Sequence, residues 1–446
     1  MLYNLKAMDN DTNPAHRLYR RLMGAHPGEG TRKFIKDLSW IGASFALAKA
    51  ISSLVNIAAA RMLGPLEYGR ISVLVAAGSL LTPFLVAGWN FSIMRYGADK
   101  KIRDQVFGAA GAVFLTAAVA MAAVVPLFRD HIAPLLGITP DMLLLALAYA
   151  AASGAFVLVS SAQQCLGNFS ERGAGEIIFS VLLAACFFLL LRYAGASYKA
   201  MAFAYTAAFG GVTVFWLIRL AGKVRIGLPD RALFLEMTEH GMYYFGSALG
   251  AFLTMNVQSL VLNSFLTARE VGIYAAYNIS TIGISGYLGY SVSAVLFPKA
   301  ANAEDKRFIW DLGVRVWRYL APAGVLLFFL SETAVLTLMG RHQYVMDFTL
   351  MALFAVCGTL MLVYTSLAQI IFSDGLRASR LALMIMLGTG SLNFIACILL
   401  IPRFRLAGAA VSMILTYGAA LLWLWRTKEP HLRGASAGLT PDRGPA

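Results

Sequence analysis

Long apolar stretches, separated by short polar breaks, follow one another along almost the whole chain. A bilayer core of roughly 30 Å needs about 20 consecutive apolar residues per spanning helix. The stretches are continuously apolar instead of alternating, so they favour helices over the strands of a membrane β-barrel. The twelve expected spans are residues 38–60, 70–91, 106–128, 142–166, 174–196, 199–220, 241–265, 271–297, 317–340, 346–371, 381–401 and 405–426.

Two parts of this pattern recur about two hundred residues apart. The turn RMLGPLEYG at 61–69 matches SFLTAREVG at 264–272 at its Leu, Glu and final Gly positions, and SSAQQ at 160–164 matches SLAQI at 366–370. Six helices are an even number, so both halves enter the membrane from one side and the repeat is parallel. The sequence therefore predicts an all-α polytopic membrane protein of about 12 transmembrane helices in two six-helix lobes. The expected parts are a cytoplasmic tail at 1–37, an N-lobe at 38–220, a cytoplasmic linker at 221–240, a C-lobe at 241–426 and a cytoplasmic tail at 427–446.

Composition and charge agree with a membrane protein. Of 446 residues, 59% are hydrophobic and 13% charged, whereas soluble domains average about a quarter charged. The net charge of +14 is explained by the expected membrane topology. The segments expected on the cytoplasmic side carry roughly three times as many Lys and Arg residues as those expected on the outer side. This positive-inside bias places both termini in the cytoplasm and leaves no need for a nucleic-acid partner.

No pattern of a catalytic or cofactor site occurs in the sequence. The four cysteines are isolated, the six histidines lack metal-ligand spacing, and neither a GxxxxGK[ST] loop nor a GxSxG elbow is present. We therefore expect no cofactor, no metal and no enzymatic activity. Energy for a transport cycle would come from an ion gradient, H⁺ or Na⁺, or from use of the substrate on the far side.

Three motifs carry a family resemblance over roughly residues 36–426: the turn LGPLEYG, its partner AREVGIYAAYN and the ending LLIPRFRLAGAAVS. With them the chain resembles bacterial O-antigen and exopolysaccharide flippases of the MATE-like exporter superfamily. The resemblance implies that an undecaprenyl-diphosphate-linked repeat unit is carried from the cytoplasmic to the outer leaflet of the inner membrane by alternating access. It also implies a pathway of lipopolysaccharide or exopolysaccharide synthesis, with a polymerase and export machinery as partners. One residue departs from the family pattern, since Arg405 stands where relatives have glycine.

Two other functions are weighed against this one. A cation-coupled multidrug exporter of the same superfamily would need a deep acid in one lobe. A membrane-embedded polysaccharide polymerase or ligase would need a sizeable outer loop, whereas the outer loops expected here are short.

Lys49 is the most informative candidate for substrate binding. It lies in the middle of the first expected span, too deep to reach either interface easily. A charge at that depth should face an aqueous cavity or a partner, and Ser53 and Asn56 continue a polar stripe along the same helix face. The alternative is an ion pair that locks the bundle, for which Glu332 is the only plausible deep acid.

The remaining candidates are polar side chains near the expected cavity. Shifted by the repeat, the stripe becomes Asn256, Ser259 and Asn263 on the seventh span, where interhelical hydrogen bonding is an equal alternative. Amides, hydroxyls and a few cations would suit sugar hydroxyls and a diphosphate. The other candidates are Arg95, which could instead be a positive-inside anchor, and Gln163, Gln369 and Asn278.

Overall fold

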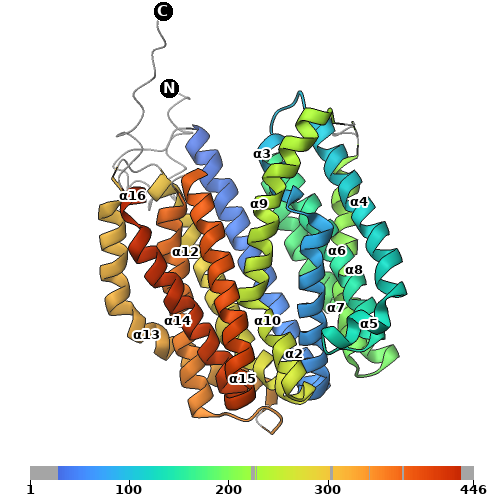
Figure 1. Ribbon diagram of the computed structural model, residues 1–446, viewed down its shortest axis with the longest axis vertical. Helices are drawn as coiled ribbons and strands as arrows, with labels where there is room; N and C mark the ends of the chain where they lie inside the picture. The colour runs from blue at the N-terminus through green and yellow to red at the C-terminus, as the bar shows by residue number, and fades with distance from the viewer. Residues whose placement is uncertain are drawn as a thin grey trace, which may run out of the picture.

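The computed structural model describes residues 29–221, 227, 229–301, 305–340, 342–373 and 376–432. Within these ranges every regular element is a helix, and the helices stand side by side in a single bundle (Figure 1), which confirms the all-α fold. Most of the expected tails, 1–37 and 427–446, and part of the expected linker, 221–240, lie outside the described residues. The elements are α2 (Glu29–Val86), α3 (Trp89–Tyr96), α4 (Arg103–Leu127), α5 (Arg129–Leu135), α6 (Pro140–Cys165), α7 (Phe169–Ala194), α8 (Tyr198–Leu220), α9 (Arg231–Met255), α10 (Val257–Phe265), α11 (Ala268–Asn278), the π-helical turn η1 (Ile279–Gly283), α12 (Ile284–Ala301), α13 (Arg307–Gly340), α14 (Phe348–Phe372), α15 (Leu376–Thr427) and α16 (Glu429–Leu432).

Eight of the described helices are long and apolar enough to cross a membrane, or nine if α9 and α10, which meet at 48°, form one bent span. Two of the eight are longer than one crossing requires: 45 residues in Gly42–Val86 and 48 in Arg380–Thr427. At 1.5 Å per residue each would extend about 70 Å, twice the thickness of the hydrocarbon core. Each contains one residue with non-helical backbone angles. The total of twelve crossings stays a prediction.

The first of these breaks lies at Gly64 and divides α2 into two segments. The polar stretch 61–69, expected as a loop, is helical on both sides of this one residue. Gly64 has φ 74° and ψ 169°, a conformation that side chains with a Cβ atom rarely adopt. The first segment runs from one end of the bundle to the other, and the second returns beside α6 (Figure 1).

The second break lies at Arg405 and divides α15. Its φ of 53° and ψ of −129° are uncommon for a residue other than glycine, the residue that the family resemblance implies at this position. The Arg405 side chain binds Glu270 at the start of α11, with Nε 3.1 Å from Oε1. The arginine therefore accepts an unfavourable backbone conformation and adds an ion pair within the C-lobe.

Glu67 and Glu270, the acids of the two repeated turns, have similar structural roles. Glu67 accepts a hydrogen bond of 2.8 Å from the backbone N–H of Tyr198, the first residue of α8. A carboxylate at a helix N-terminus is stabilised by the exposed N–H groups and the helix dipole. Glu67 thus fixes the beginning of α8, and Glu270 binds Arg405 at the beginning of the second segment of α15. These are the last long helical segments of the two halves.

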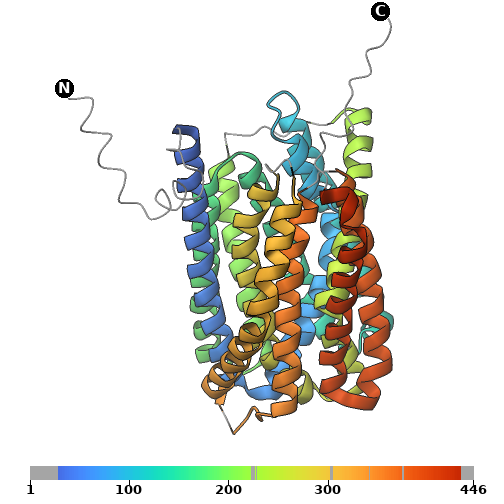
Figure 2. The same cartoon turned by 90° about the vertical axis from the view of Figure 1, so that its left-hand side faces the viewer.

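Following the expected division of the chain, we call α2 to α8 the N-lobe and α9 to α16 the C-lobe. Helix α9 begins at Arg231, inside the segment expected to be linker. In the view of Figure 2, the first segment of α2 lies at one edge against α7. We call the end with Gly64 and Arg405 the turn end, and the end with α3 and the start of α9 the basic end, after residues 95, 100, 101 and 103.

Candidate functional site

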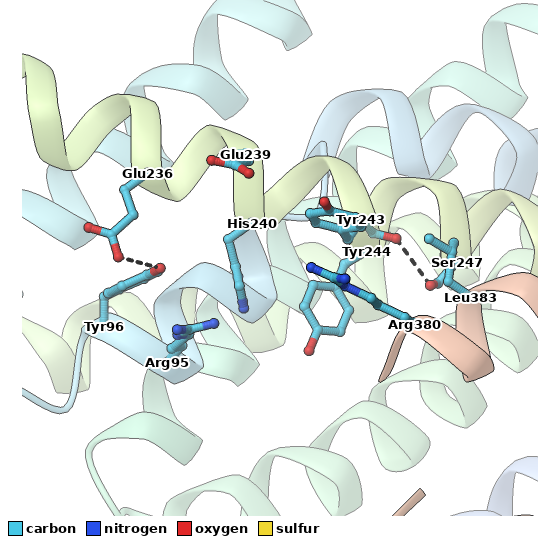
Figure 3. A pocket seen from close by; sticks show the side chains of 10 residues that line it. All are labelled: Arg95, Tyr96, Glu236, Glu239, His240, Tyr243, Tyr244, Ser247, Arg380 and Leu383. Carbon is cyan, nitrogen blue, oxygen red and sulfur yellow. Dashed lines mark hydrogen bonds between the residues drawn. The ribbon is translucent and has the colours of Figure 1, made fainter. Parts of the chain in front are cut away.

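A cavity of about 490 Å³ lies between the two lobes at the basic end (Figure 3). Three helices line it: α3 from the N-lobe, and α9 and α15 from the C-lobe. Charged side chains and tyrosines dominate the lining. We call this cavity the interlobe pocket, and its residues are Arg95, Tyr96, Glu236, Glu239, His240, Tyr243, Tyr244, Ser247, Arg380 and Leu383.

Helix α3 forms the N-lobe wall of the interlobe pocket because the chain bends away from α2 just before it. Ala87 and Gly88, which separate the two helices, both have positive φ angles, 49° and 73°. The new direction places α3 against α9, where Trp89, Ser92 and Ile93 are buried. The bend therefore brings Arg95 and Tyr96 to the lobe boundary.

Polar and aromatic contacts fix α3 on α9. The Ser92 hydroxyl donates a hydrogen bond of 2.9 Å to the carbonyl oxygen of Met237. The Tyr96 hydroxyl donates to Glu236 at 3.0 Å. Partial burial is the larger cause and this hydrogen bond the next that raise the pKa of Tyr96. The phenol therefore keeps its proton at neutral pH and remains a donor.

One guanidinium group from each lobe lines the interlobe pocket. Arg95 lies 5.2 Å from the centroid of the Tyr96 ring, and neither Arg95 nor Arg380 forms an ion pair within the part of the chain that the structure describes. Glu236 and Glu239 line the same cavity on α9, where they can accept hydrogen bonds. Two guanidinium groups with carboxylates and tyrosines suit a ligand that carries both anionic oxygens and hydroxyls.

Lys49 lies half-buried on the first segment of α2, at the boundary between the lobes. Its Nζ is 5.5 Å from the centroid of the Tyr287 ring on α12, which is close enough for cation–π attraction. Glu332 is not its partner, since that carboxyl accepts a hydrogen bond from Thr281 inside the C-lobe. Lys49 also interacts electrostatically with Glu176 on α7. The two side chains form no ion pair among the described residues.

The polar stripe next to Lys49 makes hydrogen bonds inside the N-lobe. The Ser52 and Ser180 hydroxyls lie 2.9 Å apart. Asn56 donates to the Ser52 carbonyl oxygen at 2.9 Å and accepts from the Tyr205 hydroxyl at 3.1 Å. Asn56 is thus occupied in helix packing, whereas the half-buried Ser53 has no hydrogen bond within the described chain. A role for either in binding stays a prediction.

The equivalent residues of the C-lobe mostly join the two lobes. The Ser259 and Ser72 hydroxyls lie 3.0 Å apart, across the lobe boundary. Asn263 donates to the Gly137 carbonyl oxygen of the N-lobe at 2.5 Å, near the turn end. Asn256 lies half-buried at the bend between α9 and α10. Of these three, Ser259 and Asn263 hold the lobes together in this conformation.

The remaining predicted residues are dispersed. Gln163 is fully buried in the N-lobe and accepts a hydrogen bond of 2.8 Å from Asn168. Gln369 lines a second cavity, of about 220 Å³, between α9, α14 and α15 of the C-lobe. Asn278 ends α11 and has a buried, unpartnered Oδ1 atom. Of the predicted residues, only Arg95 lines the interlobe pocket as the structure describes it.

Sequence reasoning missed the α9 side of the interlobe pocket. Residues 236, 239 and 240 precede the expected start of the seventh span at 241, so they were assigned to the linker. A signal was nevertheless present: Glu236, His240, Tyr243, Tyr244 and Ser247 recur at helical spacing on one face. A helix continued back to Arg231 would have placed them next to the membrane interface.

Comparisons with known proteins bear on this fold. The family described as polysaccharide biosynthesis protein matches residues 34–303. The uncharacterized membrane protein MJ1068 of Methanocaldococcus jannaschii is 23% identical over 429 residues, which cover 88% of this chain and 83% of that protein. The lipid II flippase MurJ in an inward closed conformation is similar with a TM-score of 0.55 at 10% identity, over 86% of this chain and 87% of MurJ. The MATE multidrug transporter DinF-BH is similar with a TM-score of 0.54 at 15% identity, over 89% of this chain and 96% of that one. At these identities the two solved structures show a shared fold alone.

Proposed function

Because the chain belongs to the polysaccharide biosynthesis protein family, we propose that it is a flippase for a lipid-linked oligosaccharide. The proposed cargo is an undecaprenyl-diphosphate-linked repeat unit of a surface polysaccharide. It moves from the cytoplasmic to the outer leaflet of a bacterial inner membrane. The basic end and both termini face the cytoplasm, as the positive-inside bias predicts.

The chemistry of the interlobe pocket carries this proposal. Arg95 and Arg380 come from opposite lobes and have no carboxylate partner among the described residues, so both are free to bind a diphosphate. A guanidinium group can donate two parallel hydrogen bonds to phosphate oxygens. The tyrosine rings supply rigid amphipathic surfaces for sugar rings, and the glutamates accept hydrogen bonds from sugar hydroxyls.

Lys49 gives the anionic part of the cargo a second position, deeper in the bundle. It is a positive charge on the first segment of α2, facing Tyr287 of the other lobe. A cation–π contact is weaker than binding of a diphosphate to a lysine, so an arriving phosphate can replace the ring as the partner of Nζ. The cargo headgroup would thus pass from the pocket at the basic end to Lys49.

Contacts at the turn end close the far side of this path. The Tyr344 hydroxyl of the C-lobe donates a hydrogen bond of 2.9 Å to the Ala60 carbonyl oxygen of the N-lobe, and Asn263 donates to Gly137. Release on the outer side requires these bonds to break while the lobes approach each other at the basic end. The proposed mechanism is therefore alternating access by movement of one lobe against the other.

The test is complementation of a host deleted for this protein, with surface polysaccharide and the lipid-linked intermediate measured together. We expect the double variant Arg95→Ala/Arg380→Ala, and separately Lys49→Ala, to lose most of the polymer and to accumulate the intermediate. Lys100→Ala is the matched control, because this exposed cation lies at the same end but does not line the pocket. Normal polymer at normal protein level in the double variant would overturn the role of the pocket.

A second function is favoured by one observation. A cation-coupled multidrug exporter needs a deep acid in one lobe, and Glu332 is an acid with a fully buried side chain in the C-lobe. The same deleted host separates the two functions. A flippase restores polysaccharide and leaves drug resistance unchanged, whereas an exporter raises resistance and leaves the lipid-linked intermediate accumulated.

A further inference from the structure

Helix α13 lies at the outer edge of the C-lobe and is longer than a membrane crossing requires (Figure 1). Its 34 residues extend about 51 Å at 1.5 Å per residue. A bilayer with its headgroups is about 40 to 45 Å thick, and spanning helices tilt by about 20° on average. The helix ends at Gly340 near the turn end, where Gln343 lies next to Gly64. The first turns of α13 therefore lie in the headgroup layer at the basic end.

These first turns carry two exposed stripes that suit a headgroup layer. Charged side chains recur at helical spacing along one stripe, and bulky apolar or aromatic side chains recur along the next. The first stripe contains Arg307, Asp311, Arg315 and Arg318, and the second contains Phe308, Leu312, Val316 and Tyr319. Phe308 and Tyr319 are each 74% exposed. A helix of this kind presents cations to lipid phosphates and its apolar face to acyl chains.

Two helices of the C-lobe place aromatic side chains at the same depth. Roughly 20 residues separate Tyr319 from Gly340, and Trp425 from the break at Arg405, which is about 30 Å of helix in each case. That length equals the thickness of the hydrocarbon core. Tyrosine and tryptophan are enriched where the core meets the headgroups. Tyr319 and Trp425 therefore mark the membrane interface at the basic end, with Arg318 directly beside it.

The end of α15 adds a cation and two indole rings next to α13. The Lys428 Nζ atom lies 3.4 Å from the centroid of the Trp425 ring and 5.3 Å from that of Trp310. The two rings are 6.0 Å apart, although they belong to different helices. Arg307, the first residue of the charged stripe, binds Glu429 at 3.1 Å. The charged stripe of α13 thus borders the end of α15.

The cations nearest the interface have no carboxylate partner. Arg315, Arg318 and Lys428 form no ion pair within the part of the chain that the structure describes. Asp311, the acid of the stripe, lies farther from the hydrocarbon core than either of these arginines. Unpaired cations at headgroup depth complement the charge of anionic lipids. A guanidinium group can also donate two parallel hydrogen bonds to one phosphate.

We propose that a rim formed by Arg315, Arg318, Trp425 and Lys428 binds the headgroup of an anionic phospholipid in the leaflet at the basic end. The arginines hold the phosphate oxygens, and Tyr319 contacts the acyl chains below them. This lipid is distinct from the cargo, because the rim lies at the outer edge of the C-lobe whereas the interlobe pocket lies between the lobes. It binds whether or not the protein is a flippase.

Native mass spectrometry of the purified full-length protein tests the rim with two lipid probes, phosphatidylglycerol and phosphatidylcholine. Both contain a phosphodiester, but only the first has a net negative charge. Each basic residue at a membrane surface favours an anionic lipid by roughly fivefold. We therefore expect wild type to bind phosphatidylglycerol more tightly, and Arg315→Ala/Arg318→Ala to lose most of this preference.

Lys100→Ala/Lys101→Ala is the matched control, because it removes the same charge from exposed positions of the N-lobe at the same end of the bundle. It should keep the preference for phosphatidylglycerol. An unchanged preference in the arginine variant would overturn the proposal. An equal loss in the lysine control would also overturn it, since overall charge would then decide the binding.

A second measurement locates the lipid and does not depend on folding of the arginine variant. In vesicles of phosphatidylcholine with a fixed fraction of lipid brominated near the headgroup, the fluorescence of wild type minus Trp425→Phe reports quenching at Trp425. We expect brominated phosphatidylglycerol to quench it more than brominated phosphatidylcholine does. Trp40, which is 50% exposed on the first segment of α2, is the control and should be quenched equally by both. Equal quenching at Trp425 would show that the rim contacts lipid without selecting its charge.

Discussion

At the scale of single residues, Glu270 joins two distant parts of the C-lobe. Its carboxylate caps α11 together with Thr267 and binds Arg405 where α15 turns. Burial favours the protonated form, but the hydrogen bonds from Thr267 and Arg405 outweigh it and hold the pKa below its ordinary value of 4.5. The ionised carboxylate therefore stabilises the folded chain.

We expect Glu270→Gln to lower the unfolding temperature of the purified protein at neutral pH. The loss should be about 1 kcal/mol or less, because Arg405 is largely exposed to solvent. A group with a depressed pKa contributes stability above its unfolded pKa, and this is lost as pH falls through the folded pKa. Thermal unfolding at about pH 7 and about pH 3 should therefore show a difference that shrinks in acid. A difference in unfolding temperature that is undiminished at the lower pH would contradict this role. The control is Glu429→Gln, in an exposed pair with Arg307, which should leave the unfolding temperature unchanged at both pH values.

Single residues also mark the limit of prediction from sequence. The depth of Lys49 predicted an aqueous cavity or a partner, because an uncompensated charge cannot face lipid, and its role in binding stays a prediction. The partner was not predictable: Glu332 is bound within its own lobe, and Tyr287 takes the place opposite Lys49. An amide such as Asn56 can serve a cavity or a helix contact equally well, and only the fold decides between them.

At the scale of elements, the two repeated turns pack directly on each other. Gly69 and Gly272, the last residues of the two matching stretches, come so close that a Cβ atom on either would lie 1.8 Å from a backbone oxygen of the opposite turn. Such a distance is far inside van der Waals contact. Two small residues therefore allow the lobes to meet at the turn end, a function that the sequence match alone did not indicate.

The substitution Gly272→Ala should destabilise the contact between the turns. The added methyl group must displace the Pro65 carbonyl oxygen, so the lobes separate at the turn end and the unfolding temperature falls. Gly111→Ala is the matched control, since nothing lies within 4 Å of the added carbon there and alanine favours a helix by roughly 0.5 to 1 kcal/mol. Equal unfolding temperatures for the two variants would show that the glycine contact does not hold the turns together.

Apolar patterning indicated most helices because spanning segments must satisfy their backbone hydrogen bonds internally. The patterning did not show that the turn at 61–69 is a break at one residue, nor that α3 leaves the line of α2. Both depend on a few backbone angles. The interlobe pocket was missed for a related reason, since it forms where α3 meets a helix that is distant in the sequence, with Ser92 and Met237 in contact. Hydropathy contains no information on that contact.

At the scale of the whole molecule, the proposed function requires the two lobes to separate where they now touch. Ser72 and Ser259 mark a suitable point, because their hydroxyls lie 3.0 Å apart across the boundary. Cysteines at such positions can form a disulfide of about 2.05 Å with little movement. In a chain whose native cysteines, Cys165, Cys186, Cys357 and Cys397, are replaced, this bond would lock the lobes reversibly.

Translocation by this locked and unlocked protein in liposomes tests the central claim most directly. The probe is the lipid-linked intermediate extracted from the host deleted for the protein, and each single cysteine variant is the control. We predict that reduced Ser72→Cys/Ser259→Cys protein moves the intermediate between leaflets, that oxidation stops it, and that reductant restores it. Movement no faster than in protein-free liposomes, or movement that continues with the disulfide fully formed, would contradict a flippase that works by separating its lobes.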